Sequence, residues 1–286
     1  MLQHCGMSII MLHCRSAIII QYSFYKNVAC FTNQLYYAFY TNFSSQTLFD
    51  GANLTAYNVA FTALPIFVFG LVARNCEAER LVQHPELYKR IARNKLLSPA
   101  ELLLWFLQGL WHSFVIFFGW ASFWQSGAAP VTSTRPELVL ARSSFGLTVY
   151  TTLMVVVSLK ILFHARSISL GFVLSLLFSF LAFIALDLIY HSLVLSTSIL
   201  NLLGDSYPES DFAPLSPEML MVAPVVFSSP VVWLLVILLS ILALIPDVVI
   251  SVVRKHWAVM KTKLMVRRKV VDSRIQQGQY RVSGHH

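Results

Sequence analysis

The chain has 286 residues, of which 57% are hydrophobic and 12% are charged, and its mean hydropathy is +0.66. Soluble domains usually carry about 25% charged residues, so the composition excludes an ordinary soluble globular protein. The net charge of +8 could suggest a nucleic-acid partner. However, the basic residues lie between apolar runs and in the tail, which suits an anionic membrane surface and no nucleic acid.

Six apolar runs are each long enough to cross a hydrocarbon core of about 30 Å. We expect an all-α polytopic membrane protein with spans at residues 17–41, 54–73, 101–124, 144–164, 168–191 and 230–253. No cleavage-type small-residue site follows the first run, so we expect this run to be retained as a span. The expected domains are a short cytoplasmic stretch at 1–16, a six-helix domain at 17–253 and a basic tail at 254–286.

Lysine and arginine are distributed unevenly over the connections between the runs. The 74–100 connection carries six of them and the tail carries nine, whereas the 42–53 and 192–229 connections carry none. Because cytoplasmic connections are enriched in these residues, both termini are predicted to be cytoplasmic.

The stretch "FYKNVACFTNQLYYAFY" places Lys26 and Asn27 inside an aromatic and apolar run. In a helix that starts near Ala17, Lys26 lies about 14 Å deep, close to the bilayer midplane. A lysine at this depth costs about 2.5–3.5 kcal/mol on insertion scales. We therefore expect Lys26 to face a protein interior or a wet cavity that offers acceptors.

The second run supplies matching polar groups. Thr55, Asn58 and Thr62 are spaced i, i+3, i+7, which places them on one face of an α-helix. Pro65 lacks an amide hydrogen, so the carbonyl of Phe61 loses its helical partner and needs another donor. Such interrupted helices with polar groups near the midplane recur in transporters.

Two interpretations of these residues stay open. In the first, Lys26, Asn27, Asn58 and Thr62 line a polar site between the first two spans. In the second, Lys26 makes only an interhelical bond to Asn58 or Phe61 and binds nothing.

Other polar residues have simpler expected roles. Asp187 and Lys160 lie near span ends and are expected to be interfacial anchors, and Gln108 and His112, four residues apart, are expected to bond to each other. The acceptor patterns at Asn42 and Asn53 match N-glycosylation but lie close to the membrane. No phosphate-binding loop, nucleophile elbow or metal-ligand spacing is present in the sequence, so we expect no metal site and no catalytic residue.

Several motifs follow one another in a recognisable order. Tyr-Lys-Asn at 25–27 is followed by Phe-Ser-x-Gln-Thr-x-x-Asp at 43–50 and by Tyr-Asn and Thr-x-Leu-Pro at 57–65. The segments "HPELYKRIARNKLLS", "LKILFHAR" and "LIPDVV" come later. This series resembles helices five to ten of the phospholipid-flipping (type IV) P-type ATPases, over nearly the whole chain after about residue 13.

The resemblance implies the membrane portion of an ATP-driven flippase. Its substrates would be phosphatidylserine or phosphatidylethanolamine, moved from the outer to the cytoplasmic leaflet, with Lys26, Asn27 and Asn58 on the headgroup path. It also implies a two-span accessory subunit, a missing N-terminal half, and a plasma, endosomal or Golgi membrane of a eukaryote. ATP and Mg²⁺ would act in the complete family protein.

The phosphorylated Asp-Lys-Thr-Gly-Thr segment and the actuator and nucleotide domains do not occur in this sequence. The chain alone is therefore expected to bind no cofactor and not to hydrolyse ATP, as a fragment, an incomplete gene product or an isoform would. One alternative is a non-transporting helical bundle that binds a flippase accessory subunit or another membrane partner. An unrelated small transporter is a third hypothesis, which the order of the motifs disfavours.

Overall fold

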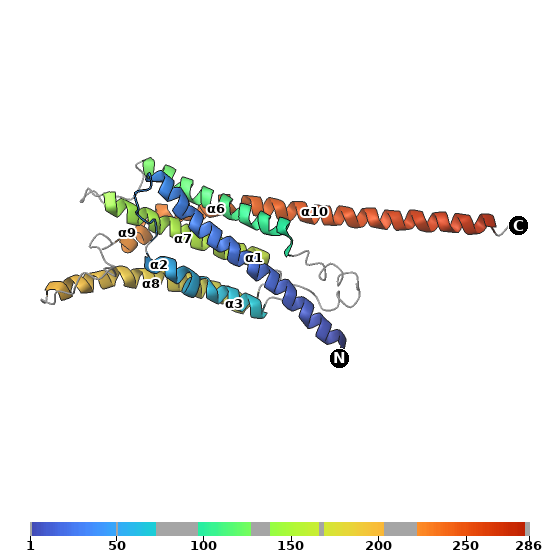
Figure 1. Cartoon of the computed structure of the whole chain (residues 1–286), viewed down its shortest axis with the longest axis horizontal. Coiled ribbons are helices and arrows are strands. Elements are labelled where there is room, and N and C mark those ends of the chain that lie inside the picture. Colours follow the sequence, from blue (N-terminus) through green and yellow to red (C-terminus); the bar gives the residue numbers. More distant parts are fainter. Residues whose placement is uncertain are drawn as a thin grey trace. The chain divides into compact units, whose positions relative to one another are not determined.

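The computed structural model describes residues 2–49, 51–72, 97–126, 138–165, 169–202 and 222–283, and within these ranges it contains helices and no strand (Figure 1). The α-helices are α1 (Leu2–Tyr40), α2 (Gly51–Ala56), α3 (Ala63–Val72), α6 (Pro99–Gln125), α7 (Leu138–His164), α8 (Leu170–Leu202), α9 (Val222–Ser228) and α10 (Pro230–Ser283). A π-helix, η1 (Tyr57–Phe61), joins α2 to α3. Most of the basic 74–100 connection and half of the acidic 192–229 loop lie outside the described residues.

Five helical segments of the described chain are long and apolar enough to cross a membrane. They are Asn53–Leu71, Pro99–Gln125, Ser143–His164, Leu170–Ile189 and Pro230–Trp257, which match five of the six expected runs. The first expected run, 17–41, is helical within α1 but is not among the five. Its lysine, asparagines and glutamines lower its mean hydropathy. The chain is an all-α, multi-pass integral membrane protein.

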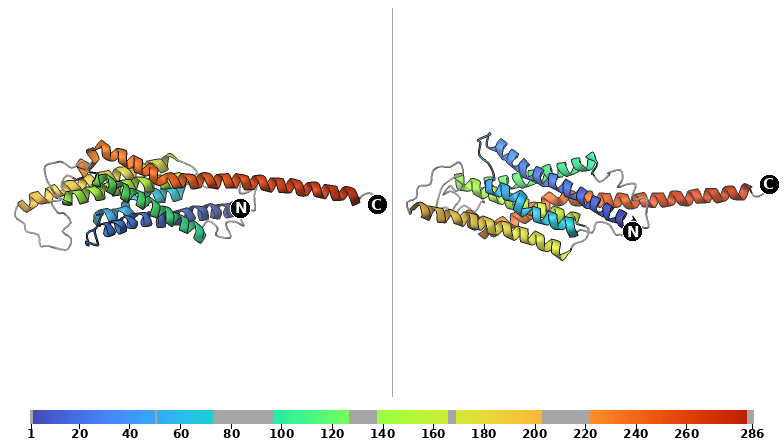
Figure 2. Two further views of the ribbon diagram at one scale, coloured as in Figure 1. Left: turned by 90° about the horizontal axis from the view of Figure 1, so that it is seen from above. Right: turned by 60° about the horizontal axis from the view of Figure 1, so that its bottom comes forward.

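The chain divides into two compact units, Met1–Ala243 and Leu244–His286. Unit 2 consists of the C-terminal part of α10, with Pro246 inside the helix. In unit 1, α1 packs against α6, α3 packs against α8, and α7 contacts both α6 and α9 (Figure 2). The first two spans thus pack against different neighbours, and the site lies where α1 meets η1 and α3.

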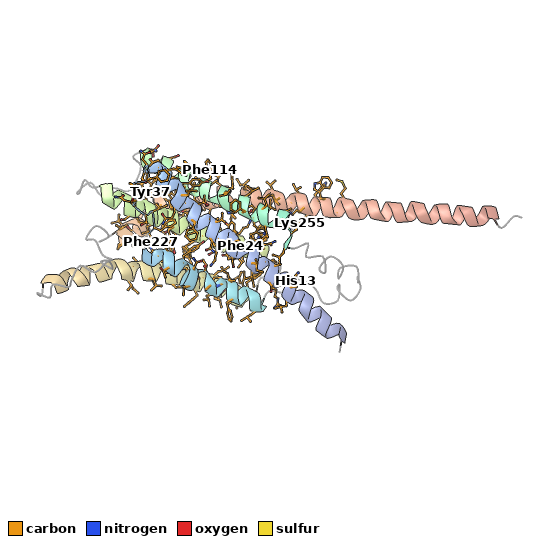
Figure 3. All side chains as sticks on the ribbon, in the orientation of Figure 1. His13, Phe24, Tyr37, Phe114, Phe227 and Lys255 are labelled. Carbon is orange, nitrogen blue, oxygen red and sulfur yellow. The ribbon has the colours of Figure 1, made fainter. Side chains whose placement is uncertain are left out.

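Helix α7 is the central element of unit 1. In the most apolar 18-residue stretch of its span Ser143–His164, 78% is buried. The corresponding share is 28% in each of the spans Asn53–Leu71, Leu170–Ile189 and Pro230–Trp257. The outer helices instead present large apolar side chains: Phe24 on α1 is 64% exposed and Phe114 on α6 is 47% exposed (Figure 3). Exposed apolar side chains of this size suit a surface that contacts lipid.

The start of α6 follows directly from its sequence. Ser98 precedes the helix with extended backbone angles, and its hydroxyl accepts a hydrogen bond from the Glu101 amide at 3.4 Å. Pro99 occupies the first helical position, where its missing N–H leaves no bond unmade. Ser-Pro-x-Glu is thus a helix N-terminus that the sequence alone specifies.

The turn from α1 to α2 is anchored by a close backbone contact. The Leu48 amide donates to Gln34 Oε1 at 2.8 Å, and the buried Phe49 packs edge-on against Tyr150 with ring centroids 5.3 Å apart. A Cβ placed on Gly146 of α7 would lie 2.4 Å from the Leu48 carbonyl oxygen. Gly146 therefore permits an approach that no larger residue allows.

The two glycosylation patterns differ in their surroundings. Asn42 is exposed on this turn with a positive φ of 51°. Asn53 is partly buried, and its amide Nδ2 donates to Asp187 Oδ1 at 2.9 Å. The Asn53 side chain thus already serves an interhelical bond to α8.

Replacing Gly146 by alanine should destabilise the protein by about 1–3 kcal/mol, because the added methyl group would overlap a backbone carbonyl rather than a flexible side chain. The matched control is Gly171→Ala on α8, where a Cβ meets nothing within 4 Å. Thermal unfolding of both variants in the same detergent measures the difference. Equal melting temperatures would contradict the tight packing at Leu48.

Candidate functional site

Lys26 forms the centre of a polar contact between the first two spans. It is 6% exposed, and its ammonium donates to Thr62 Oγ1 at 2.6 Å. Its Nζ also lies 5.7 Å from the centroid of the Tyr57 ring, which adds a cation–π contact. The structure thus supplies acceptors for an amine that lipid tails could not solvate.

The contact is closed into a ring of hydrogen bonds. Thr62 Oγ1 donates to the Tyr57 carbonyl at 2.6 Å, and the Tyr57 hydroxyl donates to the Lys26 carbonyl at 2.9 Å. Tyr57 and Thr62 are buried, so all three side chains are shielded within unit 1. Lys26 is therefore bonded through its side chain and through its backbone to the same short segment.

The π-helix produces this geometry. The Thr62 amide donates to the Tyr57 carbonyl at 3.1 Å, a five-residue spacing in place of the α-helical four. Pro65 has no amide hydrogen to offer the Phe61 carbonyl, and the Ser179 hydroxyl of α8 donates to that carbonyl instead. π-Helical turns occur frequently at functional sites.

The extra residue in the π-turn changes which side chains share a face. Thr62 is buried, whereas Thr55 and Asn58 are exposed. The expectation that these three residues lie on one face is wrong, because the 3.6-residue period does not hold through η1. The second interpretation gave Lys26 a bond to Asn58 or Phe61, whereas in the structure its ammonium bonds to Thr62, which the first interpretation had grouped with it.

The two asparagines expected on the headgroup path, Asn27 and Asn58, directly follow Lys26 and Tyr57 in the chain. Asn58 is exposed on η1, directly after Tyr57. Asn27 is partly buried on α1, and among the described residues its Oδ1 has no hydrogen-bond partner. The structure therefore joins Lys26 to Thr62, while the Asn27 side-chain oxygen has no partner within the described residues.

Two further contacts, nearer the start of α1, hold this helix against α3. Arg15 Nη1 donates to the carbonyls of Gly70 and Leu71, each at 3.2 Å. A Cβ on Gly70 would lie 3.2 Å from Ile19 Cδ1, so the two helices are close here. Arg15, Ile19 and Lys26 recur at spacings of four and seven residues and form one face of α1.

Four residues have roles that differ from those expected. Lys160 is 0% exposed and donates to Gln108 Oε1 at 2.9 Å, and Asp187 is 1% exposed and accepts from Asn53. Neither is an interfacial anchor. His112 bonds through Nδ1 to the Tyr25 hydroxyl, so Gln108 and His112 each have a partner on another helix. Sequence spacing cannot show such partners, because they come from distant segments.

Comparison with known proteins identifies the family. Residues 11–260 match the model of the phospholipid-translocating P-type ATPase C-terminal region. The chain belongs to this family.

Individual phospholipid-translocating ATPases show the same relationship. The chain is 29% identical to human "Phospholipid-transporting ATPase IH" over 90% of its own length, and 32% identical to the mouse protein of that name over 85%. It is 29% identical to yeast "Phospholipid-transporting ATPase DRS2" over 82%. These matches cover 21%, 19% and 16% of the respective relatives, so the chain spans about a fifth of their length. It corresponds to their C-terminal membrane region.

Two contributors to this polar site were not predicted from the sequence. The sequence predicts no role for Tyr57 beyond its place in a motif. In the structure its hydroxyl donates to the Lys26 carbonyl, and its carbonyl accepts from Thr62 Oγ1. Ser179 lies in an apolar run and was overlooked. A hydroxyl inside such a run, facing a helix that contains a proline, is a signal that could have identified Ser179.

Replacing Ser179 by alanine should destabilise unit 1 by about 1–3 kcal/mol, because the Phe61 carbonyl would stay buried without a donor. Ser175→Ala, one turn earlier on α8, is the control. The Ser175 hydroxyl donates to the Phe172 carbonyl of its own helix, so its loss should cost clearly less. Thermal unfolding in detergent compares the two variants, and equal effects would show that Phe61 does not depend on Ser179.

Proposed function

We propose that this chain is the substrate-path portion of an ATP-driven phospholipid flippase. Its substrate would be an aminophospholipid, phosphatidylserine or phosphatidylethanolamine, moved from the outer to the cytoplasmic leaflet. Family membership and the five apolar spans support the assignment to a phospholipid transporter. The finer choice of headgroup and direction rests on the motif resemblance together with the contact at Lys26.

The observation that carries the proposal is the pairing of a buried ammonium with a neutral hydroxyl. The partners that the structure gives Lys26 Nζ are Thr62 Oγ1 and the Tyr57 ring, neither of which carries a charge. Charge-assisted bonds to phosphate or carboxylate are roughly twice as strong as neutral ones. The Lys26 ammonium would therefore exchange Thr62 for an anionic headgroup with a gain in interaction energy.

The neighbouring carboxamides complement such a headgroup. Within the described part of the chain Asn27 Oδ1 has no hydrogen-bond partner, and an amide oxygen can accept a hydrogen bond from a headgroup amine. Asn58 is exposed beside the contact and can donate to phosphate oxygens through its NH₂ group. Lys26, Asn27, Asn58 and Thr62 together offer both donors and acceptors, as a zwitterionic or anionic headgroup requires.

The rest of the proposed cycle would lie outside this chain. ATP and Mg²⁺ would act in an N-terminal part, where an aspartate would be phosphorylated. A two-span accessory subunit is the proposed protein partner, and the plasma membrane or an endosomal or Golgi membrane the proposed location. Pro65 and η1 would then be the point at which the second span adapts as the headgroup passes.

The test uses the chain in nanodiscs of phosphatidylcholine with a small fraction of photoactivatable phosphatidylserine. Lys26→Met keeps the side-chain length but removes the charge, so the preference for phosphatidylserine should fall about tenfold, the effect of losing one hydrogen bond to a charged group. Thr55→Val is the control, because Thr55 is exposed and its hydroxyl donates to the Gly51 carbonyl of its own helix. An unchanged preference in Lys26→Met would overturn the headgroup role.

A further inference from the structure

A second buried lysine contacts α1 at the residue next to Lys26. Lys160 of α7 is 0% exposed, and its ammonium donates to Gln108 of α6 at 2.9 Å. Its Nζ lies 4.8 Å from the centroid of the Trp105 ring and 5.3 Å from that of the Tyr25 ring. Tyr25 directly precedes Lys26, so of two adjacent residues of α1 one contacts Lys160 and the other contacts Thr62.

We propose that Lys160 is a positioning residue for Lys26. The ammonium of Lys160 holds the Tyr25 ring between α6 and α7, which fixes the rotation of α1 and turns Lys26 toward Thr62. The inference rests on the proposed function only in that Lys26 is taken as the residue that meets the headgroup.

Burial gives this contact its strength. A cation–π contact is stronger when both partners are removed from water, and a buried charge without partners is very costly. If α1 rotated, the Lys160 ammonium would lose its contact with the Tyr25 ring while remaining buried. The buried charge of Lys160 on α7 therefore makes rotation of α1 energetically unfavourable.

Helix geometry transmits the constraint to the next residue. Consecutive residues on an α-helix point about 100° apart, so fixing the direction of Tyr25 also fixes that of Lys26. Other bonds act on the same side: the Tyr25 hydroxyl bonds to His112 Nδ1, and the Tyr22 hydroxyl donates to the Val157 carbonyl at 3.2 Å. Of these contacts, the one from Lys160 adds a charge that cannot reach solvent.

The rival explanation is that Lys160 only fills space in the core of unit 1. Two variants separate the explanations. Lys160→Met keeps most of the volume and loses the charge, whereas Lys160→Arg keeps the charge and can still stack on aromatic faces. A packing role predicts that Met is tolerated better than Arg, and a positioning role predicts the reverse.

The readout reports the rotation of α1 without involving lipid. Ile19 lies seven residues before Lys26 on the same face of α1, and it contacts Gly70 of α3. Ile19→Cys and Gly70→Cys are introduced after Cys5, Cys14, Cys30 and Cys76 have been replaced by alanine. The rate of cross-linking by a short bifunctional thiol reagent is then measured for the chain in nanodiscs.

We expect Lys160→Met to slow cross-linking about fivefold, the effect of one lost cation–π contact, and Lys160→Arg to restore most of the rate. An unchanged rate in Lys160→Met, or a rate lower in Arg than in Met, would overturn the proposal. If Lys160→Met does not yield folded protein, Tyr25→Leu, which removes the ring that the Lys160 ammonium contacts, is judged by the same criterion.

A parallel measurement separates this inference from the proposed function. The phosphatidylserine preference of each variant is determined in the photo-cross-linking assay. If the unmodified chain shows no preference, the headgroup role fails, while the thiol cross-linking rates still decide whether Lys160 positions α1. If the preference exists, it should fall in Lys160→Met and recover in Lys160→Arg.

Discussion

The hydrogen bond from the Lys26 ammonium to Thr62 Oγ1, at 2.6 Å, is the interaction on which the arrangement of the first two spans depends. Lys26 is buried, and a charged group enclosed without partners is very costly, so its partners must come from the protein. The surrounding groups also satisfy one another: Thr62 donates to the Tyr57 carbonyl, and Tyr57 donates back to the Lys26 carbonyl. The amine is thus accommodated by a hydroxyl and an aromatic ring, with no carboxylate among these partners.

The backbone of the second span is shaped by the same requirement. Pro65 removes one amide hydrogen, and the π-turn at Tyr57–Phe61 shifts the hydrogen-bond spacing from four to five residues. In a membrane every freed carbonyl needs a donor, and Ser179 supplies it for Phe61 from a neighbouring helix. The polar contact at Lys26 is therefore supported by α8 as well as by α1, and a change in one of these helices should affect the others.

Hydropathy predicted the architecture well, because only continuous helices satisfy the backbone in lipid: five expected spans have helical, apolar counterparts. It also indicated that Lys26 needs a protein partner. The sequence already grouped Thr62 with Lys26, and the structure bonds these two side chains. The assumed α-helical period failed in placing Thr55 and Asn58 on the same face as Thr62, because it does not hold through η1. Lys160 was misinterpreted for a related reason: its depth suggested an interfacial anchor, but Tyr25, Trp105 and Gln108 from two other helices enclose it. Partners of this kind depend on tertiary packing, which sequence spacing does not encode.

The most direct test of the account is a solid-state NMR measurement on the chain in lipid bilayers, with ¹⁵N in the lysine side chains and ¹³C in threonine. The account predicts a strong dipolar contact between Lys26 Nζ and the Thr62 side chain, consistent with the 2.6 Å hydrogen bond. This contact should be absent from the spectrum of Lys26→Met, which assigns it. A Lys26 amine that instead shows contacts to lipid acyl chains and none to Thr62 would contradict the account.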